Sequence, residues 1–445
     1  MKTDIIIIGS GPGGYRTASY AAQQGKQVVI IEGGEAGGTC LNSGCIPTKC
    51  LAHDAEANAS NFAAAIERKQ LVTSQLRQGI EQLLSAPGIT FVRGMAQFKD
   101  SHTVSVDGTD YEADDIIIAT GSSAKFPPVD GITNPRVITS TQALDFQSLP
   151  AQIVIIGAGV IGMEFASILS RFGTQVTVIE YLKECLPVLD KDIAKRLRKQ
   201  IEKQQGVSFY MDSAVKAITD TEVVFVANKN GKETRLECPG CPVLVATGRQ
   251  PNTEGLNLEA AGVAHTPKGI TVNDQMLTSV PHIYAIGDVT GRQMLAHAAT
   301  FMGFRAVNTI VGKTDKIRFD IMPSAIFTYP EAASVGITED QAKQQFIDCH
   351  TLKGYYRANG KALAIDEPEG MIKLAIDEPE GMIKLVADAS GKILGCAAYG
   401  AHSADIIQEV TAYMQFDATI HDIASTVHIH PTLSEILQDA CVGVN

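Results

Sequence analysis

The chain has 445 residues, of which 45% are hydrophobic and 19% are charged, and its formal net charge at pH 7 is -12. This length predicts two to three domains with an ample core. The acidic balance argues against nucleic acid or an anionic membrane as a partner. No segment reaches the ~18 consecutive apolar residues that span a bilayer.

The N-terminus and the cysteines bear on the compartment. The apolar run after Asp4 is too short for a signal peptide, which predicts a cytoplasmic protein. In a reducing compartment, any disulfide among the nine cysteines is expected to be catalytic rather than structural.

One order of elements, namely strand, glycine turn, helix and strand, occurs twice. The elements are a strand at 4–8, a helix at about 13–24 and a strand at 27–31, then a strand at 152–156, a helix ending near 172 and a strand at 175–179. The turns contribute Gly9, Gly11 and Gly14 in the first copy and Gly157, Gly159 and Gly162 in the second. Glu32 and Glu180 end the two copies, so both predict dinucleotide-binding βαβ units.

Each unit has the chemistry of a dinucleotide site. Glycines let the backbone approach a pyrophosphate, and the helix N-terminus adds N–H donors and partial positive charge. Glu32 and Glu180 can accept hydrogen bonds from ribose hydroxyls. Glu180 would repel a 2′-phosphate and residues 181–183 contain no arginine, so NAD is favoured over NADP. Two core βαβ units without ligand are the alternative.

The rest of the chain is less regular. The Ala/Gln/Leu-rich segment 55–84 predicts one helix, and short strands are predicted at 90–97, 103–106 and 116–120. A strand at 283–286 ends at Gly287-Asp288, and a helix is predicted at 294–310. From residue 318 onward, mixed strands and helices without a glycine fingerprint indicate a separate α+β domain.

One segment of eleven residues, LAIDEPEGMIK, occurs at 363–373 and again at 374–384. An odd insertion within one strand would turn every side chain to the other face of the sheet. Each copy carries its own Pro-Glu-Gly turn signal, so an extra looped hairpin is expected. We assign this repeat no function.

The segment 37–49 carries the most specific signal. Cys40 and Cys45 in one regular helix would be about 7.5 Å apart along its axis, whereas a disulfide needs Cα atoms roughly 4.4–6.8 Å apart. A pairing of these cysteines therefore requires a distorted segment, which Gly44 allows. Pro47 suits the first turn of a helix, so Cys45 is predicted near a helix N-terminus, where a thiol pKa is lowered.

This segment resembles the active-site motif of the flavoprotein pyridine-nucleotide–disulfide oxidoreductases, and the whole chain resembles the dihydrolipoyl dehydrogenase branch of that family. The resemblance implies that Cys40 exchanges with substrate and that Cys45 contacts the flavin of a bound FAD. It also implies that Lys49 lies near the flavin N5 atom, with Glu164 as its partner.

The C-terminal segment 428–435 is similar to the family's His-Pro-Thr base motif. Histidine suits a base that accepts a thiol proton near neutral pH. The resemblance makes His430 this base and Glu435 the group that orients it, and leaves His428 as a bystander. In the family this base serves the opposite subunit, which implies a homodimer with a shared active site. A cis His430–Pro431 bond is a further hypothesis.

Other matches to the family extend over nearly the whole chain. The FAD contacts implied in this way are Gly38, Thr39, Thr120, Gly121, Gly287, Asp288, Leu295, Ala296 and His297. On the NAD side the resemblance adds Gly248. Met302 departs from the family, where we expect Glu.

Cys238 and Cys241 have CxxC spacing. A second redox centre and half of a zinc site are both conceivable, but structural zinc needs four ligands and no matching pair is visible. We therefore predict a loop with incidental cysteines and no metal.

The resulting prediction is an α/β protein with two Rossmann-like domains, for FAD and for NAD, and a C-terminal α+β dimerisation domain. The boundaries are 1–148 for the first part of the FAD domain, 149–265 for the NAD domain, 266–316 for the second part of the FAD domain and 317–445 for the dimerisation domain.

The predicted activity is oxidation of protein-bound dihydrolipoamide with reduction of NAD⁺. The predicted partner is the lipoyl-bearing subunit of a 2-oxoacid dehydrogenase or glycine cleavage complex. The alternatives are another flavoprotein disulfide reductase, a diaphorase or transhydrogenase, and a docking subunit without turnover.

Overall fold

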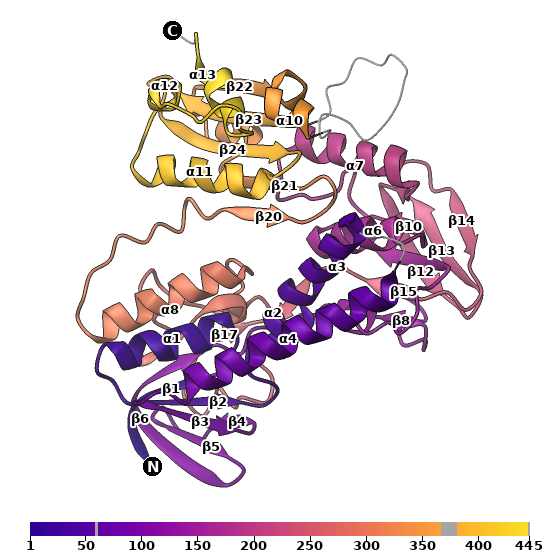
Figure 1. Ribbon diagram of the computed structural model, residues 1–445. Coiled ribbons are helices and arrows are strands. Elements are labelled where there is room, and N and C mark those ends of the chain that lie inside the picture. Colours follow the sequence, from indigo (N-terminus) through magenta and orange to yellow (C-terminus); the bar gives the residue numbers. More distant parts are fainter. Residues whose placement is uncertain (58–60, 366–380, 444–445) are drawn as a thin grey trace.

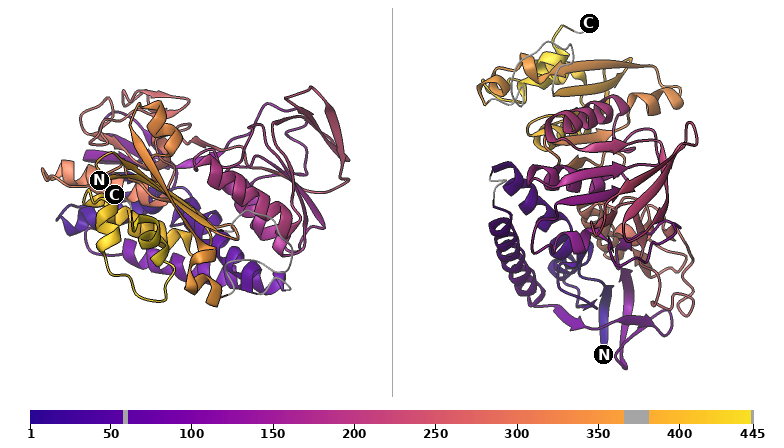
Figure 2. Two further views of the ribbon diagram at one scale, coloured as in Figure 1. Left: turned by 90° about the horizontal axis from the view of Figure 1, so that it is seen from above. Right: turned by 90° about the vertical axis from the view of Figure 1, so that its right-hand side faces the viewer.

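The computed structural model describes residues 1–57, 61–365 and 381–443. Three lobes, each built around a sheet, follow one another from bottom to right to top in Figure 1, and the two termini lie at opposite ends of the molecule (Figures 1 and 2). No helix among the described residues is long and apolar enough to cross a membrane.

The first lobe contains a seven-stranded sheet in the order β3-β2-β1-β6-β5-β4, with β19 also paired to β6. These strands are β1 (Lys2–Ile8), β2 (Val28–Glu32), β3 (Ile89–Arg93), β4 (Ala96–Phe98), β5 (Thr103–Val106), β6 (Thr109–Ile118) and β19 (Ile283–Ala285). The four isoleucines of β1 are each at most 4% exposed, because a central parallel strand is covered on both faces. The pairing of β19 returns the chain to this sheet long after its first strands.

The second lobe repeats the design with a five-stranded sheet in the order β11-β10-β9-β15-β8. Its strands are β8 (Val137–Ile138), β9 (Gln152–Ile156), β10 (Gln175–Ile179), β11 (Ser208–Tyr210) and β15 (Val243–Val245). A three-stranded antiparallel sheet lies beside it, formed by β12 (Ser213–Ile218), β13 (Glu222–Ala227) and β14 (Glu233–Glu237). The parallel register of β9 between β10 and β15 matches that of β1 between β2 and β6.

The third lobe is an antiparallel sheet in the order β20-β21-β24-β23-β22, as the α+β prediction requires. Its strands are β20 (Ser324–Ile326), β21 (Ala332–Gly336), β22 (Cys349–Tyr355), β23 (Met382–Asp388) and β24 (Ile393–Tyr399). The helices of this lobe are α9 (Glu339–Gln344), α10 (Gly360–Ala364), α11 (Ser403–Gln415), α12 (Ile420–Ser425) and α13 (Glu435–Cys441). The predicted fold class is thus confirmed, whereas the domain boundaries stay a prediction.

The remaining helices are α1 (Pro12–Gln23), α2 (Gly38–Ser43), α3 (Cys45–Ala57), α4 (Phe62–Leu84), α5 (Ser140–Ala143), α6 (Val160–Arg171), α7 (Lys191–Gln205) and α8 (Ala296–Ile310). Short pieces complete the chain: β7 (Ser122–Ala124), β16 (Arg249–Pro251), β17 (His265–Thr266), β18 (Gly269–Ile270) and the 3₁₀ turns η1 (Gly287–Thr290) and η2 (Tyr356–Ala358). The strands β7 and β16 pair and join the first two lobes.

Three predicted elements are wrong in detail. The strand predicted at 116–120 is the end of a longer strand, β6, which begins at Thr109. The single helix at 55–84 is two helices, because α4 begins anew after Asn61, whose side chain accepts a hydrogen bond from the backbone N–H of Ala64 at 3.0 Å. The strand at 90–97 is also two strands, β3 and β4, with Gly94 between them at φ 147°, a conformation that favours glycine.

Most of the repeated eleven-residue segment lies outside the described residues, and so does its predicted hairpin. The start of the first copy lies in α10, and the end of the second copy forms the start of β23. Lys384, in that second copy, is one of the buried links between the second and third lobes. It is 2% exposed and contacts Asp190 at 2.9 Å, Asp192 at 3.3 Å and Glu339 at 2.8 Å.

We expect Lys384→Met to destabilise the protein by about 3–5 kcal/mol, because it leaves the buried carboxylate of Asp190 without its cation. Equilibrium unfolding in urea measures this. The matched control is Lys343→Met, which removes an exposed cation from the same Glu339 and should change stability little. Equal, small effects of both substitutions would contradict this role for Lys384.

Candidate active site

Cys40 and Cys45 lie at a break between two helices. Cys40 is in α2, which ends at Ser43, and Cys45 is the first residue of α3. Between them Gly44 has φ -146° and ψ -112°, which belongs to neither helix, and a Cβ at Gly44 would lie 2.9 Å from the carbonyl oxygen of Thr39. The predicted distortion and the helix-start position of Cys45 are therefore both present. Both cysteines are free thiols in this structure.

The two thiols differ in acidity. A hydrogen bond from the Cys40 thiol lowers the pKa of Cys45 to about 7, and the Lys49 cation adds to this effect against the cost of burial. The same hydrogen bond, together with burial, raises the pKa of Cys40. Above about pH 7 the pair therefore holds one proton on Cys40 and a thiolate on Cys45.

Lys49 is fixed beside this thiolate by two distant parts of the chain. Its ammonium lies 2.9 and 3.0 Å from the two carboxylate oxygens of Glu164, which is buried in α6. It also lies 4.6 Å from the ring centroid of Phe327, whose backbone N–H donates to Glu164 at 2.9 Å. The predicted pair of Lys49 and Glu164 is thus in contact. The role of Phe327 was not predicted, because a backbone N–H donor cannot be recognised from the sequence.

The two glycine turns have the same shape. A Cβ on Gly9 or Gly157 would lie 2.4 or 2.6 Å from a carbonyl oxygen of a neighbouring strand end. A Cβ on Gly14 or Gly162 would lie 1.9 Å from the first glycine of its own turn. These positions therefore require glycine for close packing.

The middle glycine of each turn faces open space instead. A Cβ built on Gly11 or Gly159 meets no atom within 4 Å. In each turn this open position lies immediately before the first turn of a helix, α1 or α6, where backbone N–H groups favour a phosphate. The residues present therefore fit two dinucleotides, one at each turn.

Both predicted acids, Glu32 and Glu180, accept hydrogen bonds from residues of the glycine turns. One carboxylate oxygen of Glu32 accepts hydrogen bonds from the backbone N–H and the hydroxyl of Ser10, both at 2.7 Å. One oxygen of Glu180 accepts from the backbone N–H of Ala158 at 2.5 Å, and the other accepts from that of Leu182 at 2.7 Å. Contact of these acids with ribose stays a prediction.

The remaining predicted contacts of the first unit lie around its open turn. Gly38 begins α2 beside the turn, since a Cβ there would lie 2.7 Å from the Cα of Gly11, and Thr39 follows it. The hydroxyl of Thr120 donates to the carbonyl oxygen of Asn252 at 2.7 Å, and the side-chain amide of Asn252 donates to the carbonyl oxygen of Thr120 at 3.0 Å. A Cβ on Gly121, or on Gly248 in the second unit, would meet no atom within 4 Å, and both residues have positive φ.

Asp288 belongs to a chain of polar contacts that the sequence did not reveal. The Ser122 hydroxyl donates to Asp288 at 2.5 Å, and the Nε of Arg249 donates to the same hydroxyl at 2.7 Å. The backbone N–H of the neighbouring Gly287 donates to the sulfur of Met302 at 3.3 Å. Met302, which stands where we expected Glu, therefore acts as a weak hydrogen-bond acceptor for the turn at Gly287.

The segment at 295–297 forms the start of α8, as predicted. Leu295 is its N-cap and Ala296 its first residue. The Nε2 atom of His297 lies 2.8 Å from the carbonyl oxygen of Pro323. The N-terminus of α8, which is the positive end of its helix dipole, therefore lies at this edge of the first lobe.

His430 and Glu435 are in contact, but they lie apart from the two cysteines. The Nδ1 atom of His430 is 2.9 Å from Glu435, and the His430–Pro431 bond is cis. A hydrogen bond from the backbone N–H of Thr432 and another from His430 lower the pKa of Glu435. The pair lies at α13 at the top of Figure 1, whereas α2 lies near the middle. The imidazole is 80% exposed.

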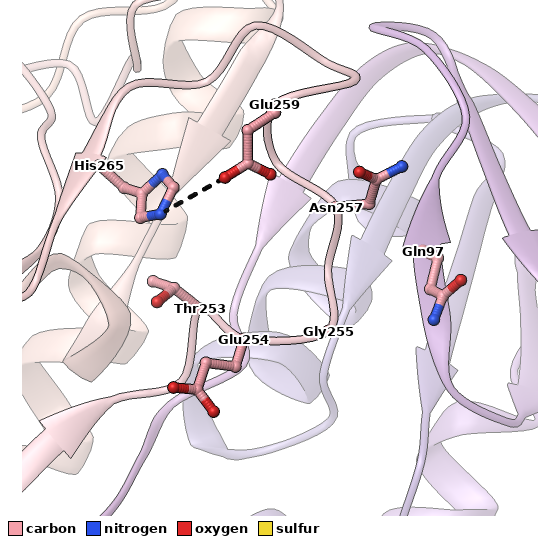
Figure 3. Close-up of a pocket in the computed structure, with 7 residues that line it drawn as sticks. All are labelled: Gln97, Thr253, Glu254, Gly255, Asn257, Glu259 and His265. Atoms are coloured by element: carbon pink, nitrogen blue, oxygen red, sulfur yellow. Dashed lines mark ion pairs between the residues drawn. The ribbon is translucent and has the colours of Figure 1, made fainter.

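A separate cavity of about 390 Å³ lies at the edge of the first lobe (Figure 3). Its lining residues are Gln97, Thr253, Glu254, Gly255, Asn257, Glu259 and His265. None of them belongs to the predicted site. The described residues contain no group of three or more His, Cys, Asp and Glu placed to hold a metal ion.

Comparison with known proteins agrees with this geometry. The family model described as pyridine nucleotide-disulphide oxidoreductase matches residues 3–303, and that family's dimerisation domain matches residues 322–441. A mitochondrial dihydrolipoyl dehydrogenase of Pisum sativum is 37% identical, over 99% of this chain and 91% of its own. The dihydrolipoyl dehydrogenase of Bacillus subtilis is 38% identical, over 99% of this chain and 98% of its own.

Among solved structures, the HOCl-induced flavoprotein disulfide reductase RclA from Escherichia coli superposes with a TM-score of 0.87 at 30% identity. The match covers 99% of this chain and all of RclA. The class of enzyme is defined by two glycine turns, a dithiol and a dimerisation domain in one chain. The chain belongs to the pyridine nucleotide-disulphide oxidoreductase family. It is an FAD-dependent oxidoreductase that uses NAD, and its dimerisation domain supports a homodimer.

We expect the Cys45 thiol to titrate near pH 7, so that its ultraviolet thiolate absorbance is present above that pH and lost below it. Lys49→Met should move this midpoint to higher pH by about one pH unit, because the cation that stabilises the thiolate is gone. Lys125→Met, in the loop after β7, is the matched control and should leave the titration unchanged. An unchanged midpoint in Lys49→Met would refute the role of Lys49.

Proposed function

We propose that the protein is a dihydrolipoyl dehydrogenase, which oxidises protein-bound dihydrolipoamide to lipoamide and reduces NAD⁺. The observation that carries this proposal is the Cys45 thiolate held between the Cys40 thiol and the Lys49 cation. The relatives from Pisum sativum and Bacillus subtilis bear this name and match over nearly their whole length.

In this proposal Cys40 and Cys45 cycle between a disulfide and a dithiol. A thiolate of dihydrolipoamide attacks the Cys40 sulfur and breaks the Cys40–Cys45 bond, which releases the Cys45 thiolate. The substrate's second thiol then loses its proton and attacks the substrate sulfur bound to Cys40, so that lipoamide forms and Cys40 leaves. Cys45 stays a thiolate because Cys40 donates to it and Lys49 lies beside it. Bound FAD would be held by the first glycine turn and would pass the electron pair on to NAD⁺.

The choice of NAD over NADP rests on Glu180. Its carboxylate is buried at the edge of the second turn and accepts two backbone hydrogen bonds. A 2′-phosphate would meet this negative charge. The neighbouring residues 181–183 supply no arginine to offset the repulsion.

We assign the base to His430, oriented by Glu435. The contact with Glu435 places a negative charge at Nδ1, which leaves Nε2 free to accept a thiol proton. Because the imidazole is exposed on the dimerisation domain, we propose that it serves the cysteines of the partner subunit. We further propose a cytoplasmic location and a lipoyl-bearing subunit of a 2-oxoacid dehydrogenase or glycine cleavage complex as partner.

A second candidate is a flavoprotein disulfide reductase with another substrate, as the likeness to RclA allows. Steady-state kinetics distinguishes the two. We expect rapid NAD⁺-dependent oxidation of dihydrolipoamide that is lost in Cys40→Ser. A lack of dihydrolipoamide turnover with vigorous NADH-driven reduction of other acceptors would refute the proposal. If the unmodified protein turned over neither dihydrolipoamide nor the other acceptors, this would instead indicate a docking subunit.

We expect His430→Gln to lower dihydrolipoamide turnover by about 10²–10⁴-fold, because a general base contributes on that scale. Flavin reduction by NADH should be unaffected, since it does not use the substrate thiol. Stopped-flow absorbance separates the two half-reactions, and His421→Gln in α12 is the control. Equal loss in both half-reactions would show damage to the fold rather than loss of a base.

Dimers that combine one Cys45→Ser subunit with one His430→Gln subunit test the shared site. If the base and the dithiol come from different subunits, one of the two sites in such a dimer is intact and turnover returns to about half of wild type. Inactive mixed dimers would show that both groups act within one subunit.

A further inference from the structure

A second pair of cysteines lies outside the active site, in the turn between β14 and β15. Cys238 and Cys241 are 3% and 7% exposed. The backbone N–H of Cys241 donates to the carbonyl oxygen of Cys238 at 3.3 Å, and Gly240 has φ +70°. A β-turn of this kind brings its end Cα atoms within about 7 Å, close to the separation that a disulfide spans.

The two sulfurs converge on each other and on one cation. Their thiols are in hydrogen-bond contact. The Nη1 atom of Arg136 lies 3.3 Å from the sulfur of Cys238 and 3.6 Å from that of Cys241. The same nitrogen donates to the carbonyl oxygens of both cysteines at 3.1 Å.

The guanidinium of Arg136 is fixed in this place by the backbone. Its Nε donates to the carbonyl oxygen of Thr219 at 2.5 Å, and its Nη2 donates to that of Glu222 at 2.6 Å. Within the described residues, its hydrogen-bond partners include no carboxylate. The positive charge is therefore not neutralised by an acid, and both sulfurs share it.

This arrangement favours a redox pair over a metal site. A cation already lies beside both sulfurs and would repel a metal ion, and two thiols are half of the ligand set that structural zinc requires. A fixed positive charge instead stabilises a thiolate, which is the species that reacts with oxidants.

We propose that Cys238 and Cys241 are a second redox pair, which closes to an intramolecular disulfide when the protein meets a peroxide-class oxidant. The Cys238 sulfur, nearer to Arg136, attacks one peroxide oxygen. The O–O bond breaks, water leaves and a sulfenic acid forms on Cys238. The Cys241 sulfur then attacks the Cys238 sulfur, the S–S bond forms, and the S–O bond breaks to release a second water. Two electrons pass from the thiols to the peroxide.

Two features set the properties of this pair. Burial, followed by the neighbouring Cys238, raises the pKa of Cys241 to about 12, so Cys241 keeps its proton and can supply it to the departing oxygen. The pair belongs to the second lobe, whereas Cys40 and Cys45 lie at the junction of α2 and α3. Because the two pairs lie on different elements of the chain, we expect NADH to reopen the Cys40–Cys45 pair and not the Cys238–Cys241 disulfide.

The test uses the purified FAD-loaded dimer and hydrogen peroxide, followed by alkylation of free thiols and peptide mass spectrometry. We expect a peptide that holds residues 238–241 two hydrogens lighter and protected from alkylation. Excess NADH should reopen the Cys40–Cys45 pair and leave this disulfide intact, while dithiothreitol should reduce both. Cys238→Ser and Cys241→Ser should each abolish it, and Cys349→Ser should leave it unchanged.

A separate variant tests the role of the Arg136 cation. Arg136→Leu should slow disulfide formation by about tenfold, because the cation that lies 3.3 Å from the Cys238 sulfur is gone. If this variant does not fold, the two serine variants and the wild-type protein still decide the question. Overoxidation of Cys238 without a disulfide, zinc bound by the pair, or full reduction of the pair by NADH would each overturn the proposal.

Discussion

The account depends on one constraint, namely that the Cys45 sulfur is negatively charged although it is partly buried. Burial alone would keep this thiol protonated. The Cys40 hydrogen bond and the Lys49 cation offset that cost and bring its pKa to about 7. A thiolate in this position is the donor that a flavin disulfide oxidoreductase requires, and loss of either neighbour would raise the pKa of this sulfur.

The fold serves this constraint by bringing distant parts of the chain to one ammonium. Lys49 lies in α3, Glu164 lies in α6 of the second nucleotide-binding unit, and Phe327 follows β20 of the dimerisation domain. The carboxylate of Glu164 binds Lys49 and the backbone N–H of Phe327 at the same time. The relative position of the three lobes and the acidity of Cys45 are therefore linked through one buried carboxylate.

Local rules predicted the parts of the fold that depend on neighbouring residues. The glycine turns and the helix start at Cys45 follow from spacing, and they are present. The break after Ala57 was missed because the apolar periodicity continues across it, while the capping side chain of Asn61 decides the new start. His428 was taken for a bystander, yet its side chain is buried against Glu409 at 3.0 Å, a contact that depends on how α11 packs. Such long-range contacts, like that between Arg249 and Ser122, have no local signature.

The most direct measurement is an anaerobic titration of the enzyme with dihydrolipoamide while its visible spectrum is recorded. If the Cys45 thiolate lies against the flavin, a long-wavelength band appears at two-electron reduction, weakens as the pH falls below about 7 and is absent in Cys45→Ser. A spectrum that passes directly to fully reduced flavin, with no such band at any pH, would contradict the account.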